Sequence, residues 1–434
     1  MNYQGKKAAF YTLGCKLNFS ETSTIAGSLE GVGFEKVDFD DKADLYVINT
    51  CSVTNQGDKS SRNIIRKAVR QNPDALVVVV GCYAQLKPDE IGHIEGVDLI
   101  LGTQEKFRIP EHLGTLTKRD RTEIHISRFQ NMNDFQRAFS WGDRTRSFLK
   151  VQDGCDYYCS FCTIPYARGK SRNDTIQNTV KEAEKAVSRG FKEIVLTGVN
   201  IGDFGKSTGE TFYDLLKAIE KVEGLRRLRI SSVEPNLLKD QIIELVARST
   251  VLMPHFHIPL QSGSDEMLSL MKRKYSSGLF ASRIRKIREL IPDAFIGVDV
   301  IAGSNGESEA LFRESYDFIN SLDISQLHAF PYSERNGTQA LKIPWKVPVE
   351  ERKLRTQKYI NLSEKKLYAF YKRNLGASRM VLFEDHNNRK GIAGFTENYI
   401  RVETGYSPDL VNQLVKVKLL GIAENGHVKV AFEN

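Results

Sequence analysis

The stretch DGCDYYCSFCTIPYARGKSR, residues 153–172, places three of the chain's six cysteines within eight residues, in the spacing C-x3-C-x2-C. A structural zinc site needs four closed ligands, usually as two separated pairs, and ordinary ferredoxin clusters use four thiolates in other spacings. No fourth Cys or His follows nearby, since the next histidines downstream are His255 and His257. Three thiolates on one short loop instead suit three irons of a cubane cluster and leave its fourth iron open to a substrate or cofactor.

The residues around this stretch alternate between strand-like and helix-like segments, which predicts a barrel. Strands are expected at SFLKV, EIVLTG, RLRISS, HFHIPL, FIGVDVIAG and QLHAFPY, and helical segments follow most of them. Six βα repeats are too few for a closed eight-stranded barrel, so we expect an open, partial (β/α)6 barrel. Its active face is the edge where the strands end. Cys155, Cys159 and Cys162, the loop triplet, follow the first strand on that edge.

The first third of the chain is an α/β segment that predicts a second three-thiol site. Continuous β-branched runs such as ALVVVVG are typical of a parallel sheet covered on both faces. Cys15, Cys51 and Cys82, the strand-end triplet, each stand one residue beyond a strand-like run, with separations of 36 and 31 residues, about one βαβ unit each. Because parallel strands end on one edge, we expect topology to bring these thiols together. Three buried, inert cysteines are the alternative.

The remaining segments define the domain boundaries. Residues 103–145 are polar and weakly periodic, which predicts a linker with a short strand. A charged amphipathic helix over 349–374 leaves the barrel, and short alternating strands then favour a small β-barrel of about sixty residues. We therefore expect an α/β domain with a parallel sheet at 1–123, the partial barrel at 141–374 and the small β-barrel at 376–434.

Composition bounds the functional classes. With 434 residues, 41% hydrophobic and 27% charged, the chain is typical of a globular protein of two to four domains. No apolar run approaches a membrane span, and the start offers no stretch long enough for a signal peptide, so we expect a cytoplasmic protein without a membrane partner. Clustered thiols in that compartment indicate metal or catalysis. The net charge of +8 permits a polyanionic partner such as nucleic acid.

The motifs quoted so far resemble those of a known family. C-x3-C-x2-C after the first strand of a partial barrel is similar to the radical S-adenosylmethionine (SAM) superfamily. Within it, the methylthiotransferases resemble this chain over essentially its whole length, at YTLGCKLNFSE, NTCSVTNQ, VVVVGCYAQ, GCDYYCSFCTIPYARG, LTGVNIGDFG, HIPLQSGSDEMLSLMKRKY and FPYSERNGT. The resemblance implies an N-terminal cluster domain, a radical SAM core and a C-terminal TRAM barrel that binds RNA. One departure is Ser304-Asn305, where the family usually has Phe-Pro.

The resemblance also implies the cofactors, two 4Fe–4S clusters and SAM. The loop triplet would hold the cluster that cleaves one SAM to a 5′-deoxyadenosyl radical, and the strand-end triplet an auxiliary cluster whose sulfur a second SAM methylates. A radical is needed because carbon-2 of an adenine carries only a non-acidic hydrogen; the cofactor supplies that step and the protein supplies position. A reducing electron donor and a sulfur source are implied partners.

Six further residues are candidates for SAM contacts. In this superfamily the side chain before the third cysteine lies against the adenine, a bare glycine backbone suits the methionine part, and polar groups at strand ends face the same mouth. These candidates are Phe161, Gly198, Ser231, Glu234, Gln261 and Asp299. For each of them, a hydrogen-bonded loop or core role is the alternative.

Basic residues near both triplets are candidates for RNA contacts. Arg62, Arg66 and Arg70 recur every fourth residue on the helix that follows Cys51, while Arg168 and Arg172 follow the loop triplet. Basic runs beside both cluster sites favour a phosphate backbone that passes between them, although a solvated helix face is the commoner explanation of such a stripe. In the small C-terminal barrel, Phe395 and Tyr399 are candidates for base stacking, or core residues.

The substrate prediction rests on the same resemblance. LGCKLN and NTCSVTN look most like the enzymes that act on N6-threonylcarbamoyladenosine in the anticodon loop of tRNA. The alternatives are methylthiolation of isopentenyladenosine in tRNA, methylthiolation of a ribosomal-protein aspartate, and a non-enzymatic RNA-binding protein with a structural metal. Arg335 is a candidate to bind the threonylcarbamoyl carboxylate, with an ordinary surface arginine as the alternative.

Overall fold

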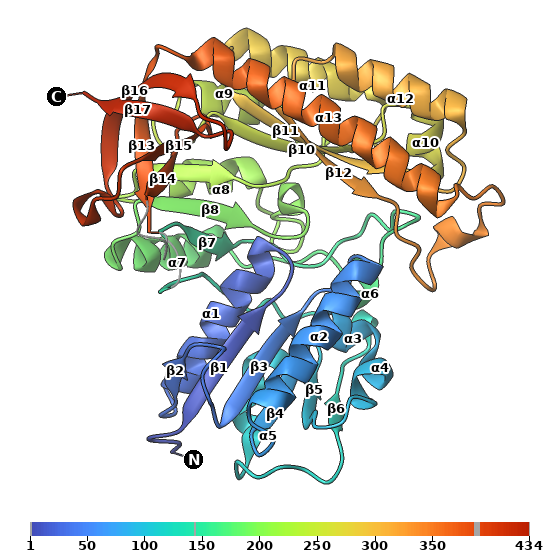
Figure 1. Ribbon diagram of the computed structural model, residues 1–434, viewed down its shortest axis with the longest axis vertical. Coiled ribbons are helices and arrows are strands. Elements are labelled where there is room, and N and C mark those ends of the chain that lie inside the picture. The colour runs from blue at the N-terminus through green and yellow to red at the C-terminus, as the bar shows by residue number, and fades with distance from the viewer. Residues whose placement is uncertain (1, 143–144, 386–390, 434) are drawn as a thin grey trace.

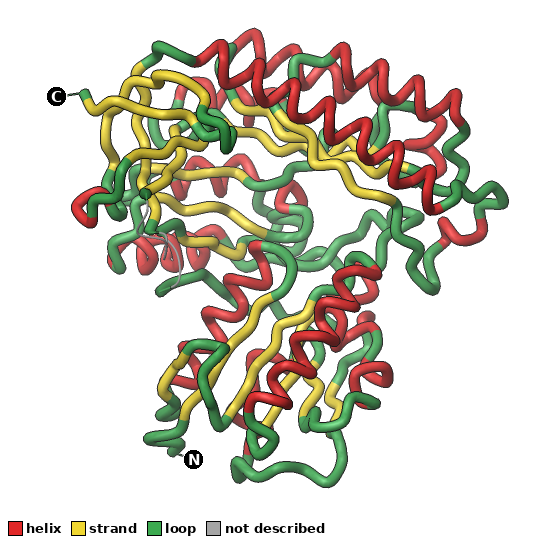
Figure 2. The backbone as a smooth tube through the Cα atoms, viewed as in Figure 1, coloured by secondary structure: helices red, strands yellow, loops and turns green. Residues whose placement is uncertain are grey.

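The computed structural model describes residues 2–142, 145–385 and 391–433 and shows three bodies (Figure 1). The N-terminal domain lies at the bottom of this view, the partial barrel and its helices lie above it, and the small C-terminal barrel lies beside the partial barrel. Figure 2 shows that irregular segments connect the N-terminal domain with the partial barrel. The predicted α/β class, with parallel sheets and a closed C-terminal β-barrel, is confirmed.

The N-terminal domain contains one parallel sheet with the strand order β2-β1-β3-β4-β5-β6. Its strands are β1 (Lys7–Thr12), β2 (Glu35–Val37), β3 (Leu45–Thr50), β4 (Leu76–Gly81), β5 (Leu99–Leu101) and β6 (Glu123–His125). Every residue of β3 and β4 is buried, which explains their continuous apolar runs. The last strand, β6, lies in the segment predicted as a linker with a short strand, and it pairs with β5 in this sheet.

Helices cover both faces of this sheet. They are α1 (Lys16–Glu30), α2 (Asn55–Gln71), α3 (Cys82–Leu86), α4 (Pro88–Gly92) and α5 (Ile109–Leu113), with 3-10 turns at Glu105–Arg108 and Phe129–Asn131. On one face α1 packs Ile25 and Leu29 against the sheet, and on the other α2 packs Ile65 and Ala68. The sheet is therefore a central layer whose strand ends lie at one edge.

The partial barrel consists of two three-stranded parallel sheets, β7-β8-β9 and β10-β11-β12. The strands are β7 (Ser147–Lys150), β8 (Glu193–Thr197), β9 (Arg227–Ile230), β10 (His255–Gln261), β11 (Phe295–Ala302) and β12 (Gln326–Pro331). Two isolated parallel bridges, Leu228 to Leu252 and Ser232 to His257, join the two sheets. Among the described residues β12 does not pair with β7, so the predicted open six-stranded barrel is confirmed.

Helices surround the outer side of this barrel. They are α7 (Ile176–Ser188), α8 (Phe212–Ile219), α9 (Asp240–Arg248), α10 (Asp265–Leu270), α11 (Ser277–Leu290), α12 (Glu309–Ser321) and α13 (Val349–Asn374), with 3-10 turns at Ile201–Asp203 and Gln339–Lys342. The short helix α6 (Ile164–Arg168) instead packs on α3 of the N-terminal domain. One continuous apolar core links the strands with these helices. The long helix α13 has the predicted bounds and packs along β12.

The C-terminal barrel is closed, with the strand order β13-β14-β15-β17-β16. Its strands are β13 (Ser378–Glu384), β14 (Ile392–Thr396), β15 (Arg401–Thr404), β16 (Leu414–Ile422) and β17 (Val428–Phe432), with a 3-10 turn at Pro408–Leu410. Arg227, the first residue of β9, donates to the Phe395 carbonyl at 2.9 Å, and Arg229 donates to the Glu397 carbonyl at 3.2 Å. The C-terminal barrel therefore lies against the amino ends of the strands, away from the cysteines.

This contact corrects the stacking role predicted for Phe395 and Tyr399. Their rings stack on each other with centroids 4.6 Å apart, and the Tyr399 ring also lies 4.5 Å from that of His255, the first residue of β10. The Arg146 guanidinium lies 4.8 Å from the Phe395 ring. Both aromatic side chains are thus occupied at the interface between the two barrels.

No described helix is long and apolar enough to cross a membrane.

Candidate active site

The loop triplet is held by backbone geometry directly after β7. Gly154 has φ +72°, and a Cβ atom there would lie 2.0 Å from the Lys170 carbonyl oxygen, so only glycine fits this close approach. Backbone N–H groups point at two of the sulfurs: that of Tyr157 lies 3.5 Å from Cys155 Sγ, and that of Ile164 lies 3.4 Å from Cys162 Sγ.

Donors and burial together make the loop triplet suitable for a metal cluster. Burial, and then the neighbouring cysteines, raise the pKa of Cys155 and of Cys162 to about 12, against the effect of the N–H donors. Arg273 donates to Cys159 Sγ at 3.0 Å and forms an ion pair with Glu234. Thiols of this kind deprotonate when they bind metal, and the N–H groups and the guanidinium then stabilise the thiolates.

The strand-end triplet is assembled by the topology of the sheet. Cys51 and Cys82 directly follow β3 and β4, whereas Cys15 lies three residues beyond the end of β1. The backbones approach closely, because a Cβ atom on Gly14 would lie 2.9 Å from Cys51 Cβ. Burial, followed by the charges of Cys82 and Cys15, raises the pKa of Cys51 to about 12. Three thiols that interact in this way fit a second cluster with one open iron.

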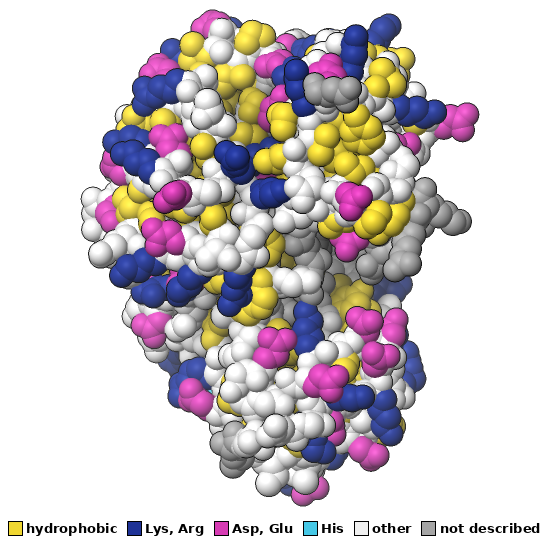
Figure 3. All heavy atoms as spheres, turned by 90° about the vertical axis from the view of Figure 1, so that its left-hand side faces the viewer, with side chains coloured by type: hydrophobic (Ala, Val, Ile, Leu, Met, Phe, Trp, Pro, Cys, Tyr) yellow, Lys and Arg dark blue, Asp and Glu magenta, His cyan; other side chains and the backbone are white. Residues whose placement is uncertain are grey.

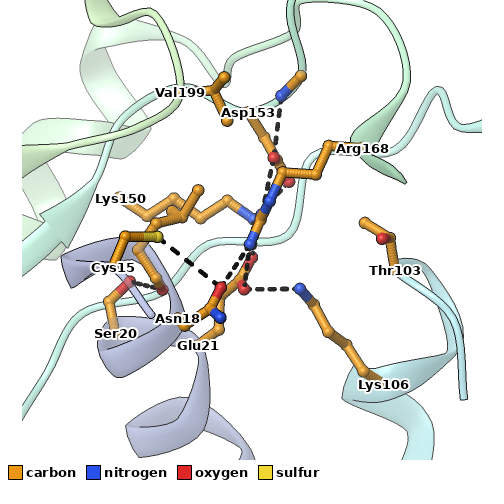
Figure 4. Close-up of polar contacts among 12 residues, drawn as sticks. Cys15, Asn18, Ser20, Glu21, Thr103, Lys106, Lys150, Asp153, Arg168 and Val199 are labelled. Carbon is orange, nitrogen blue, oxygen red and sulfur yellow. Dashed lines mark hydrogen bonds and ion pairs between the residues drawn. The ribbon is translucent and has the colours of Figure 1, made fainter. Parts of the chain in front are cut away.

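A buried ion network connects α1, which begins directly after Cys15, with Asp153, which lies two residues before the loop triplet (Figure 4). Arg168 ends α6, which begins two residues after Cys162 and packs on α3, the helix that Cys82 begins. Its guanidinium donates to Asn18 Oδ1 at 2.7 Å and to both Glu21 oxygens at 3.0 and 3.1 Å. It also reaches Asp153 at 3.0 Å, so a single side chain ties α1 to the loop triplet.

The same network contains more cations than carboxylates. Lys106 and Lys150 bind Glu21 at 2.6 and 2.9 Å, and Arg172 and Lys150 bind Asp153 at 3.0 and 2.8 Å. Four cations and two carboxylates leave a surplus of two positive charges beneath the strand-end triplet. Burial alone would raise the pKa of Glu21, but Arg168 and the two lysines lower it. The surplus would offset the negative charge of thiolates that form there when a metal binds.

This burial corrects two predicted RNA contacts. Arg168 is 2% exposed and Arg172 is 5% exposed, and both are committed to Asp153. They therefore join the domains and cannot bind a phosphate backbone at the surface. In the predicted helical stripe, Arg66 and Arg70 are exposed, whereas Arg62 is half-buried and donates to the Tyr83 hydroxyl at 2.9 Å.

A second brace crosses the domain boundary beside Cys51. Arg335, in the loop after β12, donates to Asn55 Oδ1 at 2.8 Å and to Ser52 Oγ at 2.6 Å, and pairs with Asp58 at 3.0 Å. It is 4% exposed. The predicted carboxylate-binding role is therefore wrong for this conformation, because the guanidinium already has a carboxylate partner.

The predicted SAM residues lie around the carboxyl ends of the barrel strands. Gly198 lies so close to Gln152 that a Cβ atom would be 2.8 Å from its carbonyl oxygen, and Gln261 has the left-handed φ of +70° at the end of β10. Ser231 is buried, and Phe161 is half-buried beside the loop triplet. The two acidic candidates already have protein partners. Glu234 pairs with Arg273, and Asp299 accepts a hydrogen bond from His257 at 2.7 Å.

Sequence reasoning missed the residues that connect these parts. Glu21 and Lys106 carried no motif, and their pairing at a sequence distance of 85 residues appears only in the fold. Arg273 lies in the quoted segment HIPLQSGSDEMLSLMKRKY, but nothing in its spacing indicated a bond to Cys159. His257 and His328 occupy inward positions of β10 and β12, which a strand alignment would have placed on one face.

Charged side chains cover the face that carries the C-terminal barrel (Figure 3). Lys and Arg side chains are interspersed with acidic ones in this view and do not form one continuous basic stripe. In the C-terminal barrel the exposed basic residues include Arg401, Lys416, Lys418 and Lys429. These side chains are more accessible to a polyanion than the buried arginines after the loop triplet.

Known protein families match both of the regions that carry the cysteine triplets. Residues 7–102 match the family model described as "Uncharacterized protein family UPF0004", and residues 149–319 match that of the radical SAM superfamily. The chain is 40% identical to the threonylcarbamoyladenosine tRNA methylthiotransferase MtaB of Bacillus subtilis, over 95% of this chain and 93% of that one. For the Aquifex aeolicus protein of that name the identity is 38%, over 95% and 99%.

The chain is also similar, at lower identity, to a second group of tRNA-modifying enzymes and to solved structures. The tRNA-2-methylthio-N(6)-dimethylallyladenosine synthase of Bacillus mycoides is 30% identical, over 96% of this chain and 84% of that one. Among solved structures, the radical SAM methyltransferase TsrM of Kitasatospora setae superposes with a TM-score of 0.57 at 16% identity, over 76% and 75% of the two chains. That likeness shows a shared fold.

Proposed function

Because the chain belongs to the radical SAM methylthiotransferase family, we propose that it adds a methylthio group to carbon-2 of N6-threonylcarbamoyladenosine beside the anticodon of tRNA. Identities of 34–40% to relatives named for that nucleoside, against 29–30% to relatives named for the dimethylallyl nucleoside, support this substrate. We assign residues 1–123 to sulfur delivery, 141–374 to radical formation and 376–434 to RNA docking.

One observation carries the proposal: two cysteine triplets on two domains are joined through Arg168. The ion network fixes α1, and with it Cys15, against the loop that carries Cys155. Transfer of a sulfur group to a carbon-centred radical requires both centres to face one substrate atom, and small misplacements are costly. A rigid connection between the two sites supplies that alignment.

The residues present fit two 4Fe–4S clusters and SAM. The loop triplet would bind one cluster, and its N–H donors and Arg273 would stabilise the thiolates. The strand-end triplet would bind the other, above the positive surplus of the ion network. When bound, these groups supply the 5′-deoxyadenosyl radical and the methylated sulfur. The protein itself orients the substrate base and excludes water from it.

The anticodon base must leave the RNA stack to reach the barrel. The exposed Arg66 and Arg70 on α2 and the exposed basic residues of the C-terminal barrel are candidates for backbone contacts. A threonylcarbamoyl group offers a carboxylate and a hydroxyl, and loss of a hydrogen-bonded group is discriminated far more strongly than loss of a methylene. The proposed partners are tRNA, a reducing electron donor and a sulfur source.

Three substrates test the proposal. The reconstituted enzyme is given anticodon stem–loops that carry threonylcarbamoyladenosine, isopentenyladenosine or unmodified adenosine, and the methylthio nucleoside is quantified by mass spectrometry. We expect product from the first alone. Equal turnover of the isopentenyl substrate would reject the substrate assignment, and methylthiolation of a ribosomal protein would reject the RNA proposal.

A further inference from the structure

The interior of the partial barrel carries a polar group that neither cysteine triplet uses. His257 on β10, Asp299 on β11 and His328 on β12 come from three adjacent strands, and one side-chain N or O atom of each lies within 4.8 Å of the others. Asp299 and His328 are register partners, so they leave the sheet on the same face. All three are half-buried, although most of the surrounding strand residues are buried. They therefore remain accessible to solvent inside the partial barrel.

The hydrogen bonds of His257 fix its ring and leave its neighbours free. His257 Nε2 lies 2.7 Å from Asp299 Oδ1 and donates to that carboxylate, so Nδ1 accepts from the Ser232 hydroxyl at 3.3 Å. Both nitrogens of His257 are then satisfied. Across the residues that the structure describes, no hydrogen bond reaches the His328 ring or Asp299 Oδ2. One acceptor and one imidazole thus remain available side by side.

Charged residues of other elements act on this polar group. Asp299 adds to the burial that raises the pKa of Glu234, and Glu234 pairs with the arginine that donates to a cysteine sulfur. The charge of Lys16, the first residue of α1, adds to the effects of burial and of His257 that lower the pKa of His328. The neutral imidazole has one N–H donor and one acceptor.

An apolar rim and a glycine flank the polar group. Phe330 stands two residues after His328 on β12, hence on the same face, and is 48% exposed. Its register partner on β11 is Ile301. Opposite His257, β11 carries Gly297, where an added Cβ atom would lie 3.2 Å from Phe295 Cε1 and 3.8 Å from His328 Nε2. A side chain at this position would therefore crowd the imidazole and the phenyl ring.

We propose, on the basis of the function proposed above, that Asp299 and His328 bind the edge of the target adenine, in place of the SAM contact expected for Asp299, and that Phe330 stacks on its face. An adenine with one N6–H presents a donor next to a ring-nitrogen acceptor. The carboxylate accepts from the first and the imidazole N–H donates to the second. A flipped base is held in this way, by hydrogen bonds at its edge and an apolar group on its face. His257 and Ser232 are positioning residues that orient Asp299.

The test separates base placement from radical formation. The target adenosine of the stem–loop carries deuterium at carbon-2, and deuterium in 5′-deoxyadenosine is measured together with the methylthio product and with RNA affinity for the cluster-free protein. For His328→Ala and Asp299→Asn we expect at least a tenfold loss of deuterium transfer and of product. RNA affinity should stay within threefold, because phosphate contacts dominate it.

Exposed residues give variants whose folding is not in question. Phe330→Ala should reduce deuterium transfer at least threefold, whereas Tyr368→Ala on α13, where the ring is 57% exposed, should leave it unchanged. His93→Ala, an exposed histidine of the N-terminal domain, is the control for His328→Ala. Wild-type deuterium transfer in both the Phe330 and His328 variants would overturn the assignment.

Two other results are distinguishable from that failure. If the wild-type enzyme modifies none of the three stem–loops, the proposed function fails, whatever the variants do. If purified protein that lacks both clusters still holds one divalent metal ion, and His328→Ala loses it, the group is a metal site and the base-edge assignment is wrong. The hydrogen bonds that already occupy both His257 nitrogens argue for the base and against the metal.

Discussion

The two cysteine triplets each bring three thiols together, but the chain assembles them in different ways. The loop triplet occupies one short segment, and its sulfurs accept from Arg273, which is paired with Glu234, and from two backbone N–H groups. The strand-end triplet needs three strands and a buried ion network that spans two domains. A local site is set by backbone conformation, whereas a site built by topology depends on contacts far from its ligands.

The strongest test of this difference removes one ligand from each site. Cys155→Ala should abolish reductive cleavage of SAM, because the remaining two thiolates cannot hold that cluster, while the other cluster still assembles. Cys82→Ala should do the reverse and give 5′-deoxyadenosine without methylthio product. Iron and sulfide content, 5′-deoxyadenosine and methylthio nucleoside are measured for each. Loss of all iron in either variant would mean that the sites are not independent.

The next largest effect is expected from Arg168→Met. The change leaves Glu21 and Asp153 with fewer partners in a buried network, and breaking such a network costs about 3–5 kcal/mol. Urea unfolding should show this loss, and hydrogen exchange should localise it to α1 and β7. Lys170→Met, two residues away and exposed, is the matched control. Similar stability of the two variants would show that the ion network does not stabilise the domain interface.

Glycine substitutions compare the backbone of the loop triplet with the backbone beside the strand-end triplet. Gly154→Ala forces a Cβ atom to 2.0 Å from a carbonyl oxygen, so the loop must move, at a cost of about 3 kcal/mol or more. Gly14→Ala, at φ +100°, meets Cys51 Cβ at 2.9 Å, a milder overlap that a small backbone shift relieves, so about 1–3 kcal/mol is expected. Gly209 has φ +77° and open space, and its Ala variant measures left-handed strain alone. Thermal unfolding ranks the three, and a larger effect at Gly14 would contradict the local character of the loop triplet.

The smallest effect is a difference in acid response. Three cations lower the pKa of Glu21 against burial, so its stabilising contribution is present above its unfolded value near 4.5 and is lost as the pH falls below it. Burial raises the pKa of Glu234 despite Arg273, so that carboxylate favours folding below about 4.5 and opposes it as the pH rises. Hydrogen exchange between pH 6 and pH 3.5 should show α1 loosening before the loop triplet, and the opposite order would contradict these signs.

The sequence predicted the elements but not the contacts between them. Cysteines carry their own signal, so both triplets could be listed, although Cys15 lies further from its strand than the spacing indicated. The bounds of α13 were predictable because a long polar helix has a clear periodicity. By contrast, Arg168 and Arg172 follow the loop triplet like a surface run, and only the packing of α1 on β7 buries them. The short strand expected in residues 103–145 is β6, but its pairing with β5 in the N-terminal sheet was not predictable because three residues carry too little pattern.

The ion network also imposes an order of assembly during synthesis. The ribosome releases Cys15, Cys51 and Cys82 well before Lys150, Asp153 and Arg168. Until those later residues emerge, Glu21 has Lys106 but lacks the other cations that surround it in the finished protein. The nascent N-terminal domain therefore holds Glu21 with one of its three cation partners until translation has passed Arg168.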